Sequence, residues 1–229
     1  MLWIGGFNVS TVFKITLQED GEVDVNNKRK TFVISFMIFC FIGIITIICL
    51  LANWKKDVST NLQVKKKLEK YISVEDDIRI DFEELKKINP DTIGYIKVPN
   101  TKVDYVVVKE KDNDYYLKHD FNKKSNNLGW IFMNYKNKND GSDKNLVIFG
   151  HNTSDGSMFG SLSKLLNREN INKDNLVIDY YTDKEHKKYQ IFSIYTIKPE
   201  TYYINTEFRN DEFELFKEKI KRWCSTSTR

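Results

Sequence analysis

One continuous hydrophobic stretch stands apart from the rest of the chain. Residues Phe32 to Leu51 read FVISFMIFCFIGIITIICLL, without a charged side chain. Twenty residues of α-helix span about 30 Å, which is the thickness of the hydrocarbon core of a bilayer. The run is too long for the hydrophobic part of a cleaved secretory signal, and no small-x-small cleavage site follows it. The pattern therefore predicts one retained transmembrane helix over residues 31–52.

Basic residues flank this helix on both sides and leave its orientation open. Lys28–Lys30 precede it, whereas Lys55, Lys56 and Lys65–Lys67 follow it. A count of positive charges therefore does not decide which side is cytoplasmic. Residues 1–30 form a short N-terminal segment in which no pattern assigns a role.

Helices are predicted between the transmembrane segment and residue 90. Apolar residues recur at near-helical spacing among lysines from Val58 to Ile72, which is typical of an amphipathic stalk helix. A shorter helix is predicted over Asp81–Ile88, because Asn89-Pro90 ends it. Residues 53–90 are thus expected to form a helical stalk and N-terminal helices.

From residue 91 onward, short β-branched or aromatic runs alternate with turn-rich stretches, which predicts a mainly β domain over residues 91–229. One amphipathic helix is predicted near the end, where Phe213, Phe216, Ile220 and Trp223 follow 3-4-3 spacing. The predicted strands are Ile93–Val98, Val103–Val108, Gly129–Met133, Leu146–Phe149, Leu176–Tyr181 and Tyr189–Ile197.

Composition and charge exclude several classes of function. The net charge of +4 arises from 36 basic and 32 acidic residues. They are mixed along the chain without the basic, aromatic platform of nucleic-acid-binding proteins, so no nucleic-acid partner is expected. The three histidines are isolated from one another, and the chain has no CxxC, Walker or GxGxxG motif. Neither a metal nor an organic cofactor is therefore expected.

His151 is the side chain whose position suggests chemistry. It follows the apolar run Leu146–Phe149 and Gly150, so its imidazole is expected at the open end of a buried strand. A rigid strand end suits a general acid or base. A lone histidine is more often a hydrogen-bonded structural residue, so position by itself leaves both interpretations open. His119 and His186 lie in polar stretches and are expected to be solvated.

Four segments, in order along the chain, resemble class B sortases. Leu146–Leu162 (LVIFGHNTSDGSMFGSL) resembles the catalytic-histidine segment, in which strand-Gly-His-Asn precedes Met-Phe-Gly-x-Leu. Ile93–Tyr105 (IGYIKVPNTKVDY) resembles the opening strand pair, and Asn127–Asn137 (NLGWIFMNYKN) resembles the Asn-Leu-Gly-x-Ile-Phe strand. Tyr202–Phe208 (YYINTEF), with the helix Asp211–Trp223, resembles the insertion between the sixth and seventh strands. Several motifs in order are more specific than any one of them.

The resemblance implies a sortase-type β-barrel with N-terminal helices and a helix in the loop between strands 6 and 7. It also implies a cysteine transpeptidase on the outer face of a Gram-positive bacterium, with residues 1–30 cytoplasmic. Such an enzyme cuts the C-terminal sorting signal of a secreted protein and attaches that protein to peptidoglycan. The implied partners are therefore a sorting-signal peptide, a peptidoglycan precursor or cell-wall peptide, and the membrane.

The resemblance also assigns roles to residues. A cysteine thiolate attacks the scissile carbonyl, a histidine transfers protons and an arginine stabilises the oxyanion, in keeping with general principles of nucleophilic catalysis. His151 matches the catalytic histidine, and it is the only catalytic residue that carries over. Tyr203 and Ile204 match a loop position that lines the substrate groove.

The chain departs from the family pattern after the predicted C-terminal helix. The family's nucleophile follows a strand in a Thr-Leu-x-Thr-Cys motif, and its arginine lies on the last strand; neither motif is present. Cys40 and Cys49 lie in the hydrophobic run, Cys224 follows a predicted helix, and Arg229 is the final residue. The last two strands are thus expected to be missing, through truncation, frameshift or real loss, and the chain as written is expected to be inactive.

Three hypotheses stand at this point. The first is a membrane-anchored class B sortase, by family a cysteine transpeptidase. The second is a catalytically dead, truncated sortase remnant, or a peptide-binding module that still presents a groove. The third is a membrane sensor domain unrelated to sortases, which the ordered motifs disfavour.

Overall fold

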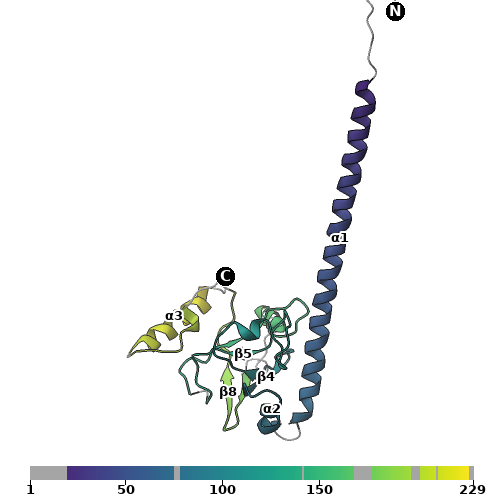
Figure 1. Ribbon diagram of the computed structural model, residues 1–229. Coiled ribbons are helices and arrows are strands. Elements are labelled where there is room, and N and C mark those ends of the chain that lie inside the picture. Colours follow the sequence, from purple (N-terminus) through teal and green to yellow (C-terminus); the bar gives the residue numbers. More distant parts are fainter. Residues whose placement is uncertain are drawn as a thin grey trace, which may run out of the picture. The chain divides into compact units, whose positions relative to one another are not determined.

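The computed structural model describes residues 20–74, 78–140, 142–167, 177–196, 202–209 and 211–226. The chain divides into two compact units, Met1–Asn53 and Trp54–Arg229. Helix α1, Asp20–Leu68, begins in the first unit and ends in the second (Figure 1).

The part of α1 in the first unit contains the predicted hydrophobic run. Its large apolar side chains from Phe32 to Leu51 are all at least 44% exposed, and the helix is long and apolar enough to cross a membrane. A helix of this kind serves either as an anchor or as a signal sequence. The helix does not break where the stalk was expected to begin, and it ends at Leu68 rather than at Ile72, which starts a strand.

Two short strands follow α1 and the 3-10 turn η1, Glu69–Tyr71. β1, Ile72–Val74, pairs antiparallel with β2, Ile78–Ile80. This hairpin was not predicted, because three residues are too few to show a periodic pattern. The short helix predicted next is confirmed as α2, Phe82–Ile88, and Asp81 caps it by accepting a hydrogen bond from the Glu84 amide at 3.0 Å.

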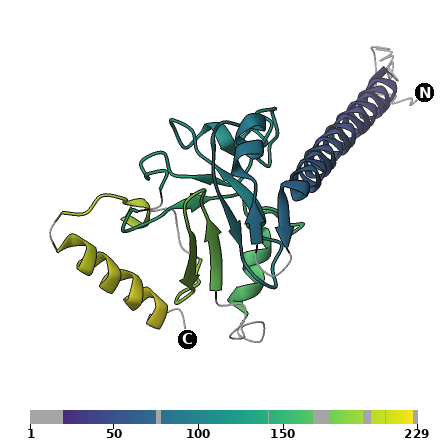
Figure 2. The same ribbon diagram turned by 90° about the horizontal axis from the view of Figure 1, so that it is seen from below.

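The second unit is built on one curled, six-stranded sheet, a half-barrel (Figure 2). Its strand order is β6-β5-β4-β3-β7-β8, and neighbouring strands are antiparallel except for the parallel pair β4–β5. The strands are β3 Thr92–Lys97, β4 Asp104–Val108, β5 Phe132–Met133, β6 Ile148–Phe149, β7 Val177–Tyr181 and β8 His186–Gln190.

The last predicted strand was wrong in position. It was expected at Tyr189–Ile197, but β8 begins at His186. A tight turn at Thr182 decides this, because the Thr182 hydroxyl accepts the amides of Lys184 and Glu185 and returns the chain at once. β8 is the edge strand and its side chains are largely exposed, so its polar sequence hides the strand pattern.

Among the described residues, the unit also contains three further 3-10 segments and one further helix. The helix confirms the prediction for Asp211–Trp223, although it extends slightly further. These elements are η2 Tyr115–Leu117, η3 Gly160–Leu166, η6 Tyr202–Ile204 and α3 Glu212–Thr226.

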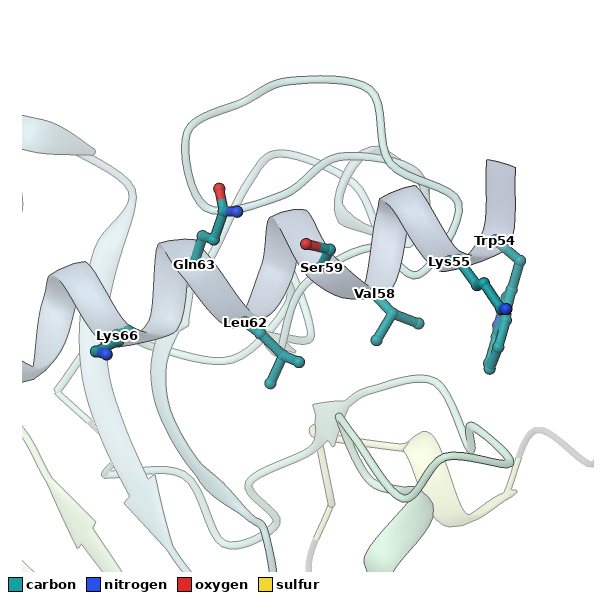
Figure 3. Close-up of a pocket in the computed structure, with 7 residues that line it drawn as sticks. All are labelled: Trp54, Lys55, Val58, Ser59, Leu62, Gln63 and Lys66. Carbon is teal, nitrogen blue, oxygen red and sulfur yellow. The ribbon is translucent and has the colours of Figure 1, made fainter. Parts of the chain in front are cut away.

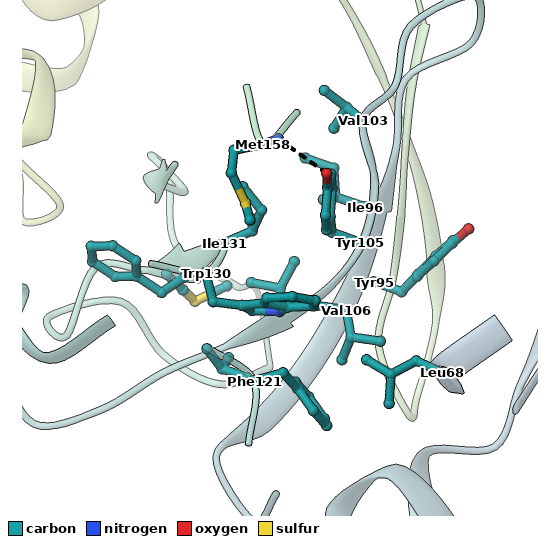
Figure 4. Close-up of a cluster of buried hydrophobic side chains, with 14 of the residues drawn as sticks. Leu68, Tyr95, Ile96, Val103, Tyr105, Val106, Phe121, Trp130, Ile131 and Met158 are labelled. Atoms are coloured by element: carbon teal, nitrogen blue, oxygen red, sulfur yellow. Dashed lines mark hydrogen bonds between the residues drawn. The ribbon is translucent and has the colours of Figure 1, made fainter. Parts of the chain in front are cut away.

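The core of the second unit lies around Trp130 (Figure 4). Its side chain is 1% exposed, and the indole Nε1–H donates to the Val106 carbonyl at 2.8 Å. The ring of Tyr105 meets it edge-on, with 5.6 Å between centroids. Val64 and Leu68 of α1 belong to the same core, so the end of α1 is an integral part of this unit.

A polar cluster beside the core makes stability depend on pH. Burial opposes ionisation of Asp91, but the ammonium group of Lys123, 2.7 Å away, and the hydroxyl of Tyr116, 2.6 Å away, outweigh it and lower the pKa of that carboxyl group. A lowered pKa in the folded state adds stability that is present above the unfolded-state pKa and is lost as the pH falls through the folded-state pKa.

We therefore expect Asp91→Asn to lower stability by about 1–3 kcal/mol at neutral pH, because it removes a charged acceptor. The variant should also lose less stability than the parent on acidification below about pH 4. Urea denaturation at several pH values measures both effects. An equal loss of unfolding free energy on acidification in the parent and in Asp91→Asn would contradict the role of the Asp91 carboxylate.

Candidate functional site

His151 lies directly beyond the C-terminal end of β6 and is half-buried. The preceding residue, Gly150, has no room for a side chain. A Cβ atom there would lie 2.4 Å from Ile131 Cδ1 and 2.9 Å from Phe159 Cδ2. The Ile131 and Phe159 side chains therefore pack directly against the α-carbon of Gly150, and a larger residue there would displace them beside His151.

The imidazole ring is oriented by one backbone carbonyl. His151 Nε2 lies 2.9 Å from the carbonyl oxygen of Leu117. A carbonyl only accepts hydrogen bonds, so Nε2 carries a proton and the neutral ring is the Nε2–H tautomer. Nδ1 makes no hydrogen bond to any described residue, which leaves it as the nitrogen that can exchange a proton with another molecule.

The Leu117 carbonyl belongs to η2, which is itself held on two sides. The hydroxyl of Tyr116 donates to Asp91 and accepts a hydrogen bond from Asn89 Nδ2 at 2.9 Å. The backbone carbonyl of Tyr116 accepts the amide of Trp130 at 2.9 Å. The acceptor for the His151 ring is thus attached both to the end of α2 and to the core.

The segment after His151 closes back on it. The Phe159 amide donates to the His151 carbonyl at 3.0 Å, and Asn152 pairs with Met158. Met158 is fully buried and has a left-handed backbone with φ of +47°, which costs a side-chain-bearing residue about 1–2 kcal/mol. The Tyr105 hydroxyl accepts the Met158 amide at 3.0 Å (Figure 4), so tertiary contacts maintain this strained loop.

Tyr203 and Ile204 lie in η6 and are half-buried. Asn145 Nδ2 donates to the Tyr203 carbonyl at 3.0 Å, and Asn134 Nδ2 lies 3.5 Å from the Ile204 carbonyl. Asn134 follows β5 and Asn145 precedes β6, so η6 is attached at the end of this strand pair opposite to His151. Among the described residues, no hydrogen bond joins His151 to Tyr203 or Ile204.

The cysteines are distributed over both units. Cys40 and Cys49 are free and exposed in the hydrophobic part of α1. Cys224 lies within α3, as expected for a residue that follows no strand. In the described parts of the chain no three His, Cys, Asp or Glu side chains gather as a metal site would need.

The residues that hold His151 and η6 in place were not predicted from the sequence. Leu117 acts through its backbone carbonyl, which leaves no signal in the residue type. Asn134 and Asn145 are polar residues next to predicted strands. Only that position indicated that their side chains could hold another segment, which is η6 in the structure.

A family model described as the sortase domain matches residues 96–218, which is more than half of the chain and includes His151. The chain belongs to the sortase family. The resemblance to class B sortases is confirmed by the relatives that follow, all of them named sortase B.

Two curated relatives show what share of a sortase B chain this sequence matches. It is 37% identical over 155 residues to sortase B of Listeria monocytogenes, covering 66% of this chain and 61% of the relative. It is 34% identical over 148 residues to sortase B of Staphylococcus aureus, covering 63% and 59%. The chain therefore spans about three fifths of the length of the curated relatives it matches.

Solved structures confirm the predicted fold class. Sortase B from Bacillus anthracis in complex with AAEK1 matches with a TM-score of 0.64 and 34% identity, over 73% of this chain and 81% of that one. The Staphylococcus aureus sortase B–substrate complex matches with a TM-score of 0.58 and 30% identity, over 75% and 76%. His151 thus lies at the end of a strand in a sortase B-like half-barrel, in which α3 follows β8.

Proposed function

We propose that this sortase is a membrane-anchored cysteine transpeptidase of class B. It cleaves the C-terminal sorting signal of a secreted protein and attaches that protein to peptidoglycan. The hydrophobic part of α1 is the single-pass anchor, with the N-terminus cytoplasmic and the second unit extracellular. The observation that carries the proposal is the orientation of His151, whose Nε2 donates to the Leu117 carbonyl and whose Nδ1 is available.

In the proposed reaction, His151 transfers protons through Nδ1. The family's cysteine thiolate, whose Thr-Leu-x-Thr-Cys motif this sequence does not contain, adds to the scissile carbonyl, and the peptide C–N bond breaks as the imidazolium protonates the leaving amine. The neutral imidazole then takes a proton from an incoming amine of the cell-wall peptide, which attacks the thioacyl carbon and releases the thiolate. The hydrogen bond to Leu117 keeps one nitrogen out of this exchange and fixes the direction of the other.

We also propose that a sorting-signal peptide binds in a groove lined by Tyr203 and Ile204. Relatives have been solved as a sortase B–substrate complex and as sortase B complexed with triglycine. Tyr203 and Ile204 lie in η6, whose carbonyls are fixed by Asn145 and Asn134, so this segment can present its side chains to an extended peptide in one defined conformation.

An internally quenched sorting-signal peptide, mixed with triglycine and the full chain in detergent micelles, tests the proposal. Where the parent chain cleaves the peptide, cleavage should fall by at least about 100-fold in His151→Gln, because general acid–base catalysis contributes that much or more; no cleavage by the parent supports the binding module described below. His186→Gln is the matched control, since His186 pairs with Asp179 on the β7–β8 hairpin. Equal loss in both variants, or cleavage that survives His151→Gln, would contradict the role of His151.

A second candidate function is peptide binding without cleavage. It is favoured by the position of Cys224 within α3 rather than after a strand. Fluorescence anisotropy of a labelled sorting-signal peptide distinguishes the two: binding without cleavage, unchanged in Cys224→Ala, supports the binding module. Cleavage that is lost in Cys224→Ala would identify Cys224 as the nucleophile and overturn the expectation that the chain is inactive.

A further inference from the structure

The last turns of α1, in the second unit, contact the supports of His151 on two sides. We propose that Asn61 and Lys65 of α1 are positioning residues for His151, acting through the Leu117 carbonyl and through the Met158 loop. The inference deepens the proposed function, because it matters for catalysis only if His151 transfers protons. The two routes consist of different contacts.

The first route runs from Asn61 to the imidazole ring. Asn61 is 3% exposed, and its Nδ2 donates to the Gly129 carbonyl at 3.1 Å. Its Oδ1 accepts a hydrogen bond from Asn126 Nδ2 at 3.0 Å, so the amide fixes both ends of the turn at residues 126–129. Gly129 packs so closely on η2 that a Cβ atom would lie 2.8 Å from the Leu117 oxygen, which is the acceptor for His151. A shift of this turn therefore moves the acceptor of the ring.

The second route runs from Lys65 to the backbone of His151. Lys65 Nζ lies 4.5 Å from the centroid of the Tyr105 ring and 3.3 Å from the Lys102 carbonyl. Burial lowers the pKa of Lys65, and a partly desolvated ammonium group binds an aromatic face more strongly than a solvated one. The Tyr105 hydroxyl in turn accepts the amide of Met158, and the next amide along the chain donates to the His151 carbonyl.

The two routes hold different parts of the same residue. Asn61 acts on the ring of His151, and Lys65 acts on its main chain, from positions one helical turn apart on α1. Gln63 lies between them on the exposed side of α1 and lines an open groove with Trp54 and Leu62 (Figure 3). It offers a matched control, because Gln63→Ala removes an amide from the same helix without touching either route.

The test uses the full chain in micelles with labelled histidine. His151→Gln assigns the His151 ring signals, and the parent should show the Nε2–H tautomer. Asn61→Ala should convert this signal to a mixture of tautomers, whereas Gln63→Ala and the His186 signals should stay unchanged. Lys65→Met, which keeps the aliphatic length, should speed hydrogen exchange of the Met158 and Phe159 amides by about tenfold or more.

The positioning role and the proposed catalysis can fail separately. Folded Asn61→Ala and Lys65→Met variants with unchanged His151 tautomer and unchanged amide exchange would overturn the inference. If Asn61→Ala fails to fold, Lys65→Met decides, since the Tyr105 ring and core remain in place. Altered His151 signals together with full cleavage activity in His151→Gln would refute the proposed catalysis and leave the positioning role intact.

Discussion

Replacing Gly129 with alanine is expected to lower the free energy of unfolding by about 2–5 kcal/mol, the sum of backbone strain and overpacking. Gly129 has a φ of +56°, in the left-handed region that disfavours a side chain. A Cβ atom there would also lie 2.2 Å from the Tyr116 oxygen and 2.8 Å from the Leu117 oxygen. Both contacts are with backbone atoms, so the clash is relieved only by moving η2 or the turn at residues 126–129.

Gly156→Ala separates the two causes. Gly156 has an equally left-handed φ of +77°, but the nearest atom to its Cβ would be Lys102 Nζ at 3.6 Å, an ordinary contact. That variant should lose only about 1–2 kcal/mol, the strain by itself. Urea denaturation followed by near-ultraviolet circular dichroism measures both, and histidine NMR should show a disturbed His151 only in Gly129→Ala. Equal losses in the two variants would mean that contact with η2 contributes nothing.

Trp130→Ala is expected to destabilise the second unit by about 3–5 kcal/mol, as large-to-small changes of buried aromatic residues do. The substitution removes a side chain that is 1% exposed and leaves the Val106 carbonyl without its indole donor. It also removes the edge-on partner of Tyr105, the residue that holds Met158. The core therefore loses volume, a hydrogen bond and an aromatic pair at one site.

Trp54→Ala is the matched control for Trp130→Ala. Trp54 is 37% exposed on α1, so the same change should cost less than about 1 kcal/mol. The same denaturation experiment applies, with tyrosine signals as the probe because a tryptophan is removed in each variant. A loss in Trp54→Ala that equals the loss in Trp130→Ala would show that the core is not centred on Trp130.

Local sequence patterns were sufficient where an element is determined by its own residues. α2 was predicted from the Asn89-Pro90 boundary, and β3 and β4 from their β-branched and aromatic runs. The pattern failed for β8, where the exposed edge of the sheet demands no apolar alternation. It failed also for β1 and β2, which pair with each other and are too short to show an alternating pattern.

The position of His151 was predictable from the sequence, whereas its hydrogen-bond partner was not. An apolar run and a glycine before it were enough to place it at the end of a strand, and ordered motifs were enough to predict the family. Its catalytic role, and the groove role of Tyr203 and Ile204, stay predictions. The acceptor of its ring lies 34 residues away at a backbone carbonyl, and the Asn61–Gly129 contact spans 68 residues.

These two contacts depend on how distant segments of the chain pack together. A backbone carbonyl is the same in every residue type, so its use as an acceptor depends on where the chain places it. Packing of α1 against the turn at residues 126–129, and of that turn against η2, sets this placement. Hydrophobic periodicity reports which face of an element is buried, whereas the direction of one hydrogen bond depends on how several elements pack together.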